Sequence, residues 1–334
     1  MSMKRIIPVL ALALLRPSAT LPTARADETG AAMAEAAQRF LGSLNEEQRT
    51  RATFAFDDPE RLNWHWIPRE RKGLPIKALA PDQRALAFGL LDTGLSNKGV
   101  LKATTIMSYE EILRVQEQGK GPVRDPELYY VSIFGAPADT GEWGWRIEGH
   151  HLSLNFTIKD DKVVSATPFM FGSNPAEVKE GVRNGLRNLA EIEGPANALL
   201  ASFDDDQRKA AIVSEEVPDV TTTPNSARFK PADPIGISSD RLNKEQRAHL
   251  ARLVTAYQAN FPEPIRDDLV EKVAKTPQKY HFAWYGPPDP DQPHAFQVQS
   301  PSLYIDFNIK QDEGNHIHTF YRNTFGDFGL PPAN

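Results

Sequence analysis

The spacing of apolar positions changes along the chain. Apolar residues three and four positions apart follow helix-start signals at Pro81 and Asn243 and predict two amphipathic helices. Downstream of the first helix the period falls to two, which predicts strands. These predicted strands are 129–134, 145–148, 151–158 and 163–167. Because only short turns separate them, they are expected to pair antiparallel, and the pattern predicts an α+β fold.

Four segments of the first half recur in the same order in the second half. The pairs are Phe40–Arg49 with Leu199–Arg208, Leu79–Arg84 with Leu242–Arg247, Tyr129–Pro137 with Tyr280–Pro288, and His151–Ile158 with Ser302–Ile309. This order predicts an internal duplication. We therefore expect two antiparallel sheets with flanking helices, related by a pseudo-twofold axis. Whether the two sheets share one core stays open.

The duplication divides the chain into four parts. We expect a signal peptide at residues 1–26, a first repeat unit at 27–175 and a second at 199–334. Between the units, Asn174 and Pro175 resemble a helix N-cap followed by proline at the first helical position. This signal predicts a connecting helix over residues 176–198.

The first residues have the order of an export signal. Lys4 and Arg5 precede the apolar run Ile6–Leu15, and Ala24-Arg-Ala26 then offers a cleavage site. Ten apolar residues are too few to span a bilayer. We expect cleavage after Ala26, a secreted or periplasmic protein and no stable membrane anchor after cleavage. An uncleaved anchor is the alternative.

Composition limits the chemistry. The 334 residues contain 38 Lys and Arg against 44 Asp and Glu, a net charge of -6, with no long basic run. Nucleic acid is therefore not an expected partner. The chain contains no Cys, which excludes disulfides and thiolate chemistry. Any metal would need nitrogen and oxygen ligands.

Two histidines near the C-terminus have the spacing of a chelating pair. His316 and His318 occupy alternate positions, and side chains two apart on a strand share a face. Imidazoles placed in this way suit a divalent metal such as Zn, Cu or Fe. Three protein ligands with one open position are typical of catalytic zinc, so a third ligand is required. The alternative is a solvated edge strand that carries two histidines.

A second cluster contains Glu148, His150 and His151. Neighbouring strand residues face opposite sides, so one histidine of the pair is expected at a given site. His151 has the parity of polar Ser153 and is our choice of metal ligand or acid–base group. His150 has the parity of Leu152 and is interpreted as a core histidine whose N–H is bound by a carbonyl.

The duplication suggests how the two clusters meet. Each repeat carries histidines on a different strand, and the two clusters face each other if the repeats meet across the pseudo-twofold axis. Ligand sites are often formed at such junctions. This arrangement would build one asymmetric site from two diverged halves.

The irregular segment around His65, Trp66 and Arg69 is a candidate for substrate binding. Aromatic rings stack on ligands, and arginine forks onto carboxylate or phosphate. Arg322 is a further candidate for positioning substrate, and Asp327 is a candidate base. The alternative is that the tryptophans of this segment merely pin the loop to the core.

Several of these segments together resemble a family known as a domain of unknown function, DUF3500. The most specific stretch is Gly149-His-His-Leu-Ser-Leu-Asn155. Other matching stretches are Trp66-Ile-Pro-Arg69, Thr167-Pro-Phe-Met-Phe-Gly172 and His316-Ile-His318. The resemblance implies no mechanism, but it supports treating these segments as one constellation.

The sequence therefore predicts an exported metal-dependent enzyme that acts on a small molecule. His151, His316 and His318 would hold the metal, and hydrolysis by a metal-activated water is the expected chemistry. Glu148 or Asp327 would serve as general base or would bind and orient a metal-ligating histidine. Oxidative chemistry with copper or iron also stays open. So do a non-catalytic periplasmic protein that binds a small ligand and a metal-free acid–base enzyme that uses His151 and Glu148.

Overall fold

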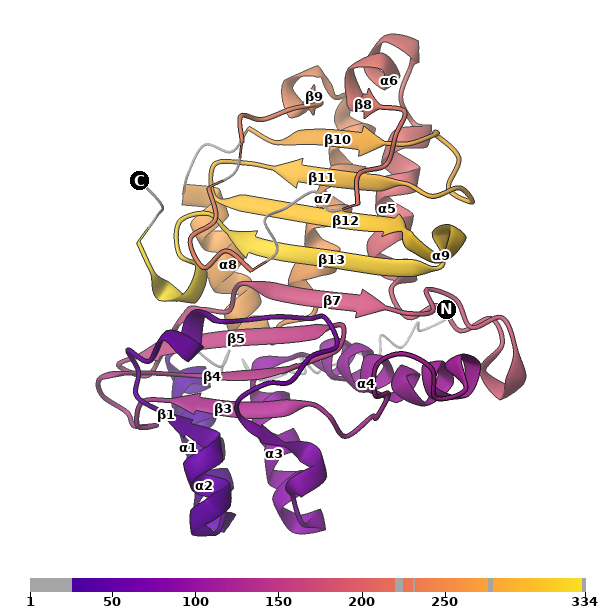
Figure 1. Cartoon of the computed structure of the whole chain (residues 1–334). Coiled ribbons are helices and arrows are strands. Elements are labelled where there is room, and N and C mark those ends of the chain that lie inside the picture. Colours follow the sequence, from indigo (N-terminus) through magenta and orange to yellow (C-terminus); the bar gives the residue numbers. More distant parts are fainter. Residues whose placement is uncertain (1–25, 220–224, 231, 276–278, 332–334) are drawn as a thin grey trace, which may run out of the picture.

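The computed structural model describes residues 26–219, 225–230, 232–275 and 279–331 (Figure 1). The predicted signal peptide, residues 1–26, lies outside the described residues except for Ala26, where helix α1 begins. Of the helices in the described ranges, none combines the length and apolar character needed to cross a membrane.

The strands in the described part of the chain form one large mixed sheet of 13 strands. Its main path runs in the order β1-β3-β4-β5-β7-β13-β12-β11-β10-β8 (Figure 1). The strands of the first half are β1 (Thr53–Phe54), β2 (Leu74–Pro75), β3 (Tyr130–Phe134), β4 (Glu142–Gly149), β5 (Leu152–Lys159), β6 (Lys162–Ser165) and β7 (Phe169–Ser173). Those of the second half are β8 (Ile212–Ser214), β9 (Ile237–Ser238), β10 (His281–Tyr285), β11 (Ala295–Gln299), β12 (Leu303–Lys310) and β13 (His316–Asn323).

The expectation of two separate sheets is wrong, because β7 and β13 pair at the centre of one sheet. They run antiparallel, in a register from Ile317 opposite Ser173 to Tyr321 opposite Phe169. An unpaired strand edge leaves its backbone groups unsatisfied, and each half of the sheet covers the edge of the other. Local alternation predicts strands close to β3, β4, β5 and β6, but alternation alone does not reveal which edges pair.

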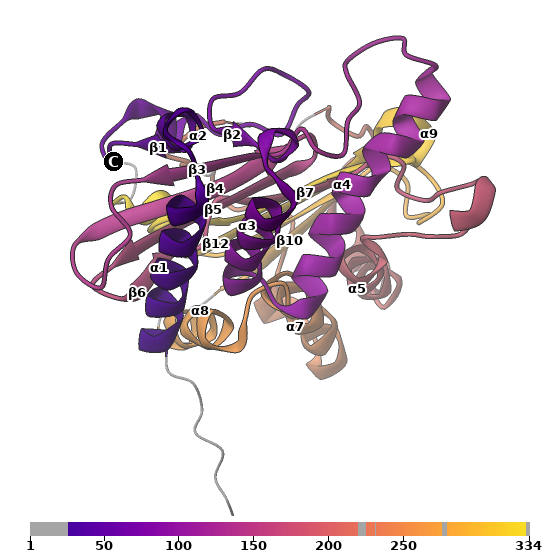
Figure 2. The same ribbon diagram turned by 90° about the horizontal axis from the view of Figure 1, so that it is seen from below.

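Helices cover one face of the sheet (Figure 2). They are α1 (Ala26–Ser43), α3 (Pro81–Gly94), α4 (Asn97–Glu117), α5 (Ala190–Ala201), α7 (Lys244–Gln258) and α8 (Glu263–Lys275). This face carries the main apolar core. Trp145 of β4, for example, packs where Gly94 of α3 leaves room, since a Cβ at Gly94 would lie 2.7 Å from its ring. Two short helices, α2 (Glu46–Ala52) and α6 (Asp205–Ala211), lie near the two ends of the sheet (Figure 1).

The opposite face of the sheet is polar and lies beneath irregular segments. Arg146 of β4 is buried and donates to Glu60, in a short 3-10 helix that spans Pro59–Leu62. A second, smaller apolar cluster is formed by Trp64, Trp66, Met170, Phe320 and Phe328. Function is expected on this face, because loops supply side chains there while the helices stabilise the other face.

The recurring glutamine motifs make the same contacts in both halves. Gln48 and Gln83 bond each other through their side-chain amides, and Gln207 and Gln246 do the same. In each half the second glutamine of the pair also bonds a carbonyl at the end of the preceding long helix, on Ser43 or Ser202. The repeated motif therefore fixes how a short helix docks on a longer one.

The predicted connecting helix over 176–198 is α-helical only from Ala190, where α5 begins, and before it lies a short 3-10 helix at Gly181–Arg183. The expected N-cap at Asn174 does not start a helix. Instead, the backbone N–H groups of Ala176 and Glu177 donate to the backbone and side-chain oxygens of Asn315. Because both N–H groups are directed at Asn315, these residues form no helical turn.

Candidate metal centre

A two-residue turn presents the paired histidines. β4 ends at Gly149, opposite the first residue of β5, and His150 and His151 form the turn between them. His151 has φ 60°, a left-handed conformation that non-glycine residues adopt at a cost of about 1–3 kcal/mol. Its backbone N–H donates to Trp66 O at 2.8 Å, and its carbonyl accepts from Gly172 N at 2.7 Å. These two bonds hold the strained residue in place.

Gly172 of β7 makes the space that the His151 ring occupies. In the sheet it lies opposite His318 of β13. A Cβ at Gly172 would lie 2.7 Å from two atoms of the His151 side chain. Because glycine leaves this position on the sheet empty, the ring of His151 lies beside His318.

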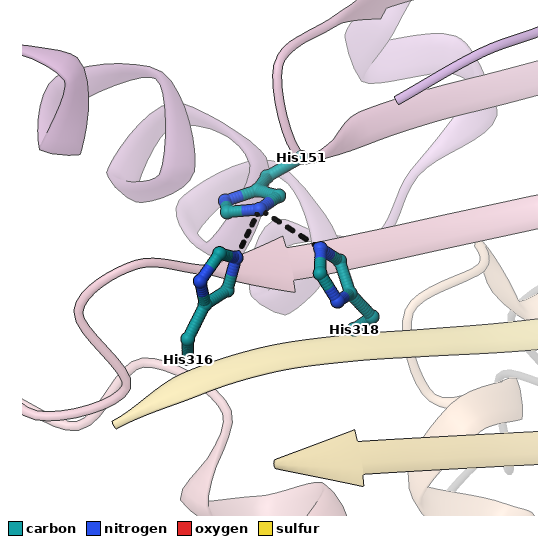
Figure 3. Close-up of side chains that lie close together, drawn as sticks. All are labelled: His151, His316 and His318. Atoms are coloured by element: carbon teal, nitrogen blue, oxygen red, sulfur yellow. Dashed lines mark hydrogen bonds between the residues drawn. The ribbon is translucent and has the colours of Figure 1, made fainter. Parts of the chain in front are cut away.

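The three histidines converge (Figure 3). His151 Nε2 lies 2.8 Å from His316 Nε2 and 3.2 Å from His318 Nε2. One nitrogen from each ring lies within 4.8 Å of the other two. Three nitrogens bound tetrahedrally to one zinc ion would lie roughly 3.3 Å apart, given zinc–nitrogen distances of about 2.0–2.1 Å. The observed spacing therefore fits a common metal with small adjustments.

Burial keeps these rings neutral. Burial lowers the pKa of His151 well below its usual range, and the neighbouring His150, His318 and His316 lower it further. Burial is the main cause that lowers the pKa of His318 to about 3, and the neighbouring His316 and His150 contribute to this shift. The pKa of His316 is also lowered by burial, against the opposing effect of Asp312. Neutral imidazole is the form that binds metals.

His150 lies behind the cluster. Its ring stacks on that of His151 with centroids 3.7 Å apart. Its Nδ1 lies 2.5 Å from Glu110 Oε1 of α4, so its partner is a carboxylate and not the expected carbonyl. Arg124 approaches the same ring at 3.0 Å and binds Glu117. The parity argument that separated the two histidines fails, because both lie in a turn.

A cavity of about 470 Å³ opens at the three histidines. Trp66, Ile67 and Phe320 supply apolar walls, and Asn308 and Gln311 supply amides. His65 and Trp66, two of the candidate substrate-binding residues, also line this cavity. Three charged residues, Arg124, Asp219 and Asp306, also lie on its wall. A concave site that combines apolar surface with polar groups is the usual form of a small-molecule site.

Glu148 and Arg69 do not line this cavity. Arg69 is exposed and lines two smaller cavities nearby. Glu148 is buried and accepts from His65 N, while Arg71 lies 3.3 Å and Arg146 lies 3.5 Å from its carboxylate. Arg71 in turn donates to carbonyls on both sides of Trp66. This carboxylate thus anchors the loop that carries Trp66.

Arg322 and Asp327 form a buried ion pair away from the histidines, with Nε to Oδ2 at 2.7 Å. Arg322 also donates to Ser226 O and lies over the rings of Trp64 and Phe229. Burial raises the pKa of Asp327, and Arg322 opposes that rise. The pair fixes the chain after β13, and neither side chain reaches the cavity.

Several residues around the site were not predicted from the sequence. Gly172, Phe320, Asn308 and Glu110 contact the histidines or line the cavity. Phe320 and Asn308 follow from alternation once β12 and β13 are known to pair, since Asn308 lies opposite His318. Nothing in the sequence marks Glu110 of α4 as a partner of His150.

The sequence matches a known protein family. The model of a family described as a protein of unknown function (DUF3500) matches residues 26–330. The chain belongs to this family. No curated protein matches it, and neither does any solved structure. The DUF3500 match spans both halves of the sheet, so it contains all three converging histidines.

Replacing Gly172 by alanine is expected to displace His151. The added Cβ has no space beside the ring, so we expect a loss of about 1–3 kcal/mol of stability and misplacement of His151 Nε2. Chemical denaturation and metal titration measure the two effects. Gly194→Ala is the matched control, because its Cβ meets nothing within 4 Å in α5. Metal binding by Gly172→Ala equal to that of Gly194→Ala would contradict the assigned role.

Acid is expected to destabilise the metal-free protein. The pKa of His318 is about 3 when folded and about 6.5 when unfolded, so between these values the unfolded chain binds more protons. Stability then falls as pH drops from about 6.5 toward 3, by up to about 1.4 kcal/mol per pH unit for this group. Urea midpoints measured from pH 7 to pH 4 test this, and His318→Asn should flatten the slope. An unchanged slope would refute the prediction.

The substitution Asp327→Asn tests whether Asp327 stabilises the fold through its ion pair or acts as a catalytic base. Breaking a buried ion pair costs about 3–5 kcal/mol, so we expect a strong loss of stability with metal affinity kept in the folded fraction. Thermal unfolding and metal titration below the transition measure both. Normal stability with lost activity would instead restore the predicted role of Asp327 as a base.

Proposed function

We propose that this protein is an exported metal-dependent enzyme whose centre is held by His151, His316 and His318. One observation carries the proposal. A ring nitrogen has a single in-plane site, either a proton or a lone pair, yet His151 Nε2 faces two other ring nitrogens at 2.8 and 3.2 Å. Hydrogen bonding would require one Nε2 proton on His151 to be shared between both neighbours, whereas a shared cation would accept a lone pair from each of the three rings.

The donor set favours zinc, copper or iron. Neutral imidazoles suit these ions, whereas calcium and magnesium prefer oxygen ligands. Three histidines leave a coordination position toward the cavity, which is the arrangement of catalytic zinc. The proposed reaction is hydrolysis by a metal-activated water.

The cavity favours an uncharged substrate. Trp66, Ile67 and Phe320 offer an apolar surface, and Asn308 and Gln311 offer amides. Neither Arg69 nor Arg322 lies on this cavity. Arg124 does line it, but its guanidinium forks onto both carboxylate oxygens of Glu117, and the other charged residues of the lining, Asp219 and Asp306, are acidic. An acidic ligand therefore lacks a free arginine fork. We therefore propose a small ester, amide or lactone as substrate, with its apolar part against Trp66 and Phe320.

The metal-free acid–base alternative has less support, because Glu148 lies beneath Arg71 and Arg146 and does not reach the cavity. A non-catalytic binding protein remains the second candidate, since the cavity suits a small ligand whether or not turnover follows. The two candidates differ in one measurement, product release by the metal-loaded protein.

We further propose that residues 1–26 are a removed export signal and that the mature protein is secreted or periplasmic. The basic start and the apolar run support this, and the family match begins at residue 26. We also propose that the halves arose by duplication. Support comes from the mirrored strand order about β7 and β13 and from the two equivalent glutamine pairs.

Purified mature protein is expected to hold one metal ion per chain. His151→Ala and His318→Ala should each remove it and lower hydrolysis of a neutral ester panel by more than about 100-fold, because each deletes a ligand. His249→Ala, on α7 at the other side of the sheet, is the matched control. Elemental analysis after supply of zinc, copper and iron in turn gives the stoichiometry.

Two outcomes decide between the candidates. Sub-stoichiometric metal under saturating supply of all three ions would refute the metal centre. One bound metal and ligand affinity without turnover would favour the binding protein.

A further inference from the structure

Asp312 contacts the ring nitrogen of His316 that points away from the other two histidines. His316 turns Nε2 toward His151 at 2.8 Å, and its other nitrogen, Nδ1, lies 3.0 Å from Asp312 Oδ2. Asn174 Nδ2 lies 3.1 Å from the same carboxylate oxygen. The three side chains form a row from Asn174 through Asp312 to His316.

This row selects one tautomer of His316. A carboxylate only accepts hydrogen bonds, so the Asp312 contact requires a proton on Nδ1. Neutral imidazole carries one proton, and with it on Nδ1 the lone pair is on Nε2. Asn174 Nδ2 also lies 3.2 Å from Nδ1, but a protonated Nδ1 cannot accept, so the amide donates to the carboxylate.

The backbone is strained where this carboxylate is placed. Asp312 and Glu313 both have left-handed backbone angles, φ 53° and φ 57°, in the α9 turn (Gln311–Gly314) between β12 and β13. Each non-glycine residue in this conformation costs about 1–3 kcal/mol. A hairpin does not need this turn, because glycine and asparagine give tight turns without strain. The strain instead places a carboxylate four residues before His316, against its ring.

We propose that Asp312 is a positioning residue that holds the Nδ1 proton of His316 and presents Nε2 to the metal. This inference rests on the proposed metal centre and extends it to a residue outside the ligand set. Carboxylates bound to the outer nitrogen of a ligating histidine fix the ring and raise its basicity. Asp312 acts in this way although its side chain is 59% exposed, because His316 itself is only 12% exposed.

The test uses glycine, which accepts left-handed angles without strain. Asp312→Gly removes the carboxylate and keeps the turn, so zinc affinity is expected to fall about 10–100-fold. Glu313→Gly is the matched control, because it changes the neighbouring left-handed residue in the same turn. Its affinity should stay within about twofold of the wild-type value. Asp312→Asn keeps an acceptor oxygen and should recover most of the loss.

A second readout needs no metal. Long-range proton–nitrogen NMR of the metal-free protein reports which ring nitrogen carries the proton. We expect His316 to be protonated on Nδ1 in wild type and in Glu313→Gly, and to gain the Nε2-protonated form in Asp312→Gly. A purely structural role for Asp312 would leave the His316 tautomer unchanged.

The outcomes are distinct. Equal zinc affinity in Asp312→Gly and Glu313→Gly, with His316 protonated on Nδ1 in both, overturns the inference. A wild-type protein that binds no metal but loses the Nδ1 tautomer in Asp312→Gly refutes the metal centre and supports the contact itself. Weaker zinc binding together with the tautomer change supports both.

Discussion

The antiparallel pairing of β7 with β13 is the interaction on which the site depends. It joins the two halves of the sheet and puts Gly172 opposite His318. Glycine leaves an empty position on the polar face at that point, and the His151 ring fills it. A shift of one residue in this register would move His318 to the helix-covered face, because strand side chains alternate. The position of one glycine therefore determines whether the three imidazoles meet.

Backbone and buried ion pairs hold the remaining geometry. The strained His151 is bonded to Trp66 on one side and Gly172 on the other. Trp66 belongs to a loop that Arg71 gathers through its carbonyls, and Glu148 anchors both this arginine and the loop backbone. The buried charges of Arg71 and Glu148 thus hold this loop in place on the polar face. This explains why a carboxylate so close in sequence to the histidines does not reach the cavity.

Periodicity predicted much of the fold and part of the site. The strands, the antiparallel meander and the histidine alternation on β13 all follow from local spacing, which reports which face a side chain takes. The pairing of β7 with β13 into one sheet does not follow from local spacing, because the hydrogen-bonding backbone edge of a strand is the same whatever its side chains are. Local spacing also did not predict the turn at His150 and His151. The prediction treated both as strand residues on opposite faces, yet they form the turn between β4 and β5, with His151 in a left-handed conformation. Glu110 and Asp312 approach the rings from other elements, and only tertiary contact reveals them.

The two ends of the central strand pair show how one sheet holds an open site at one end and a closed core at the other. At the end where β13 begins, small Gly172 and an aromatic wall leave a cavity, and the facing groups are neutral imidazoles. At the end where β13 finishes, Arg322 is paired with Asp327 and covered by Trp64, so its charge is satisfied internally. The Arg322–Asp327 ion pair is satisfied within the protein, whereas the three histidines bring their ring nitrogens within 4.8 Å of one another and could hold a metal ion. This asymmetry is why the proposed site lies at the start of β13.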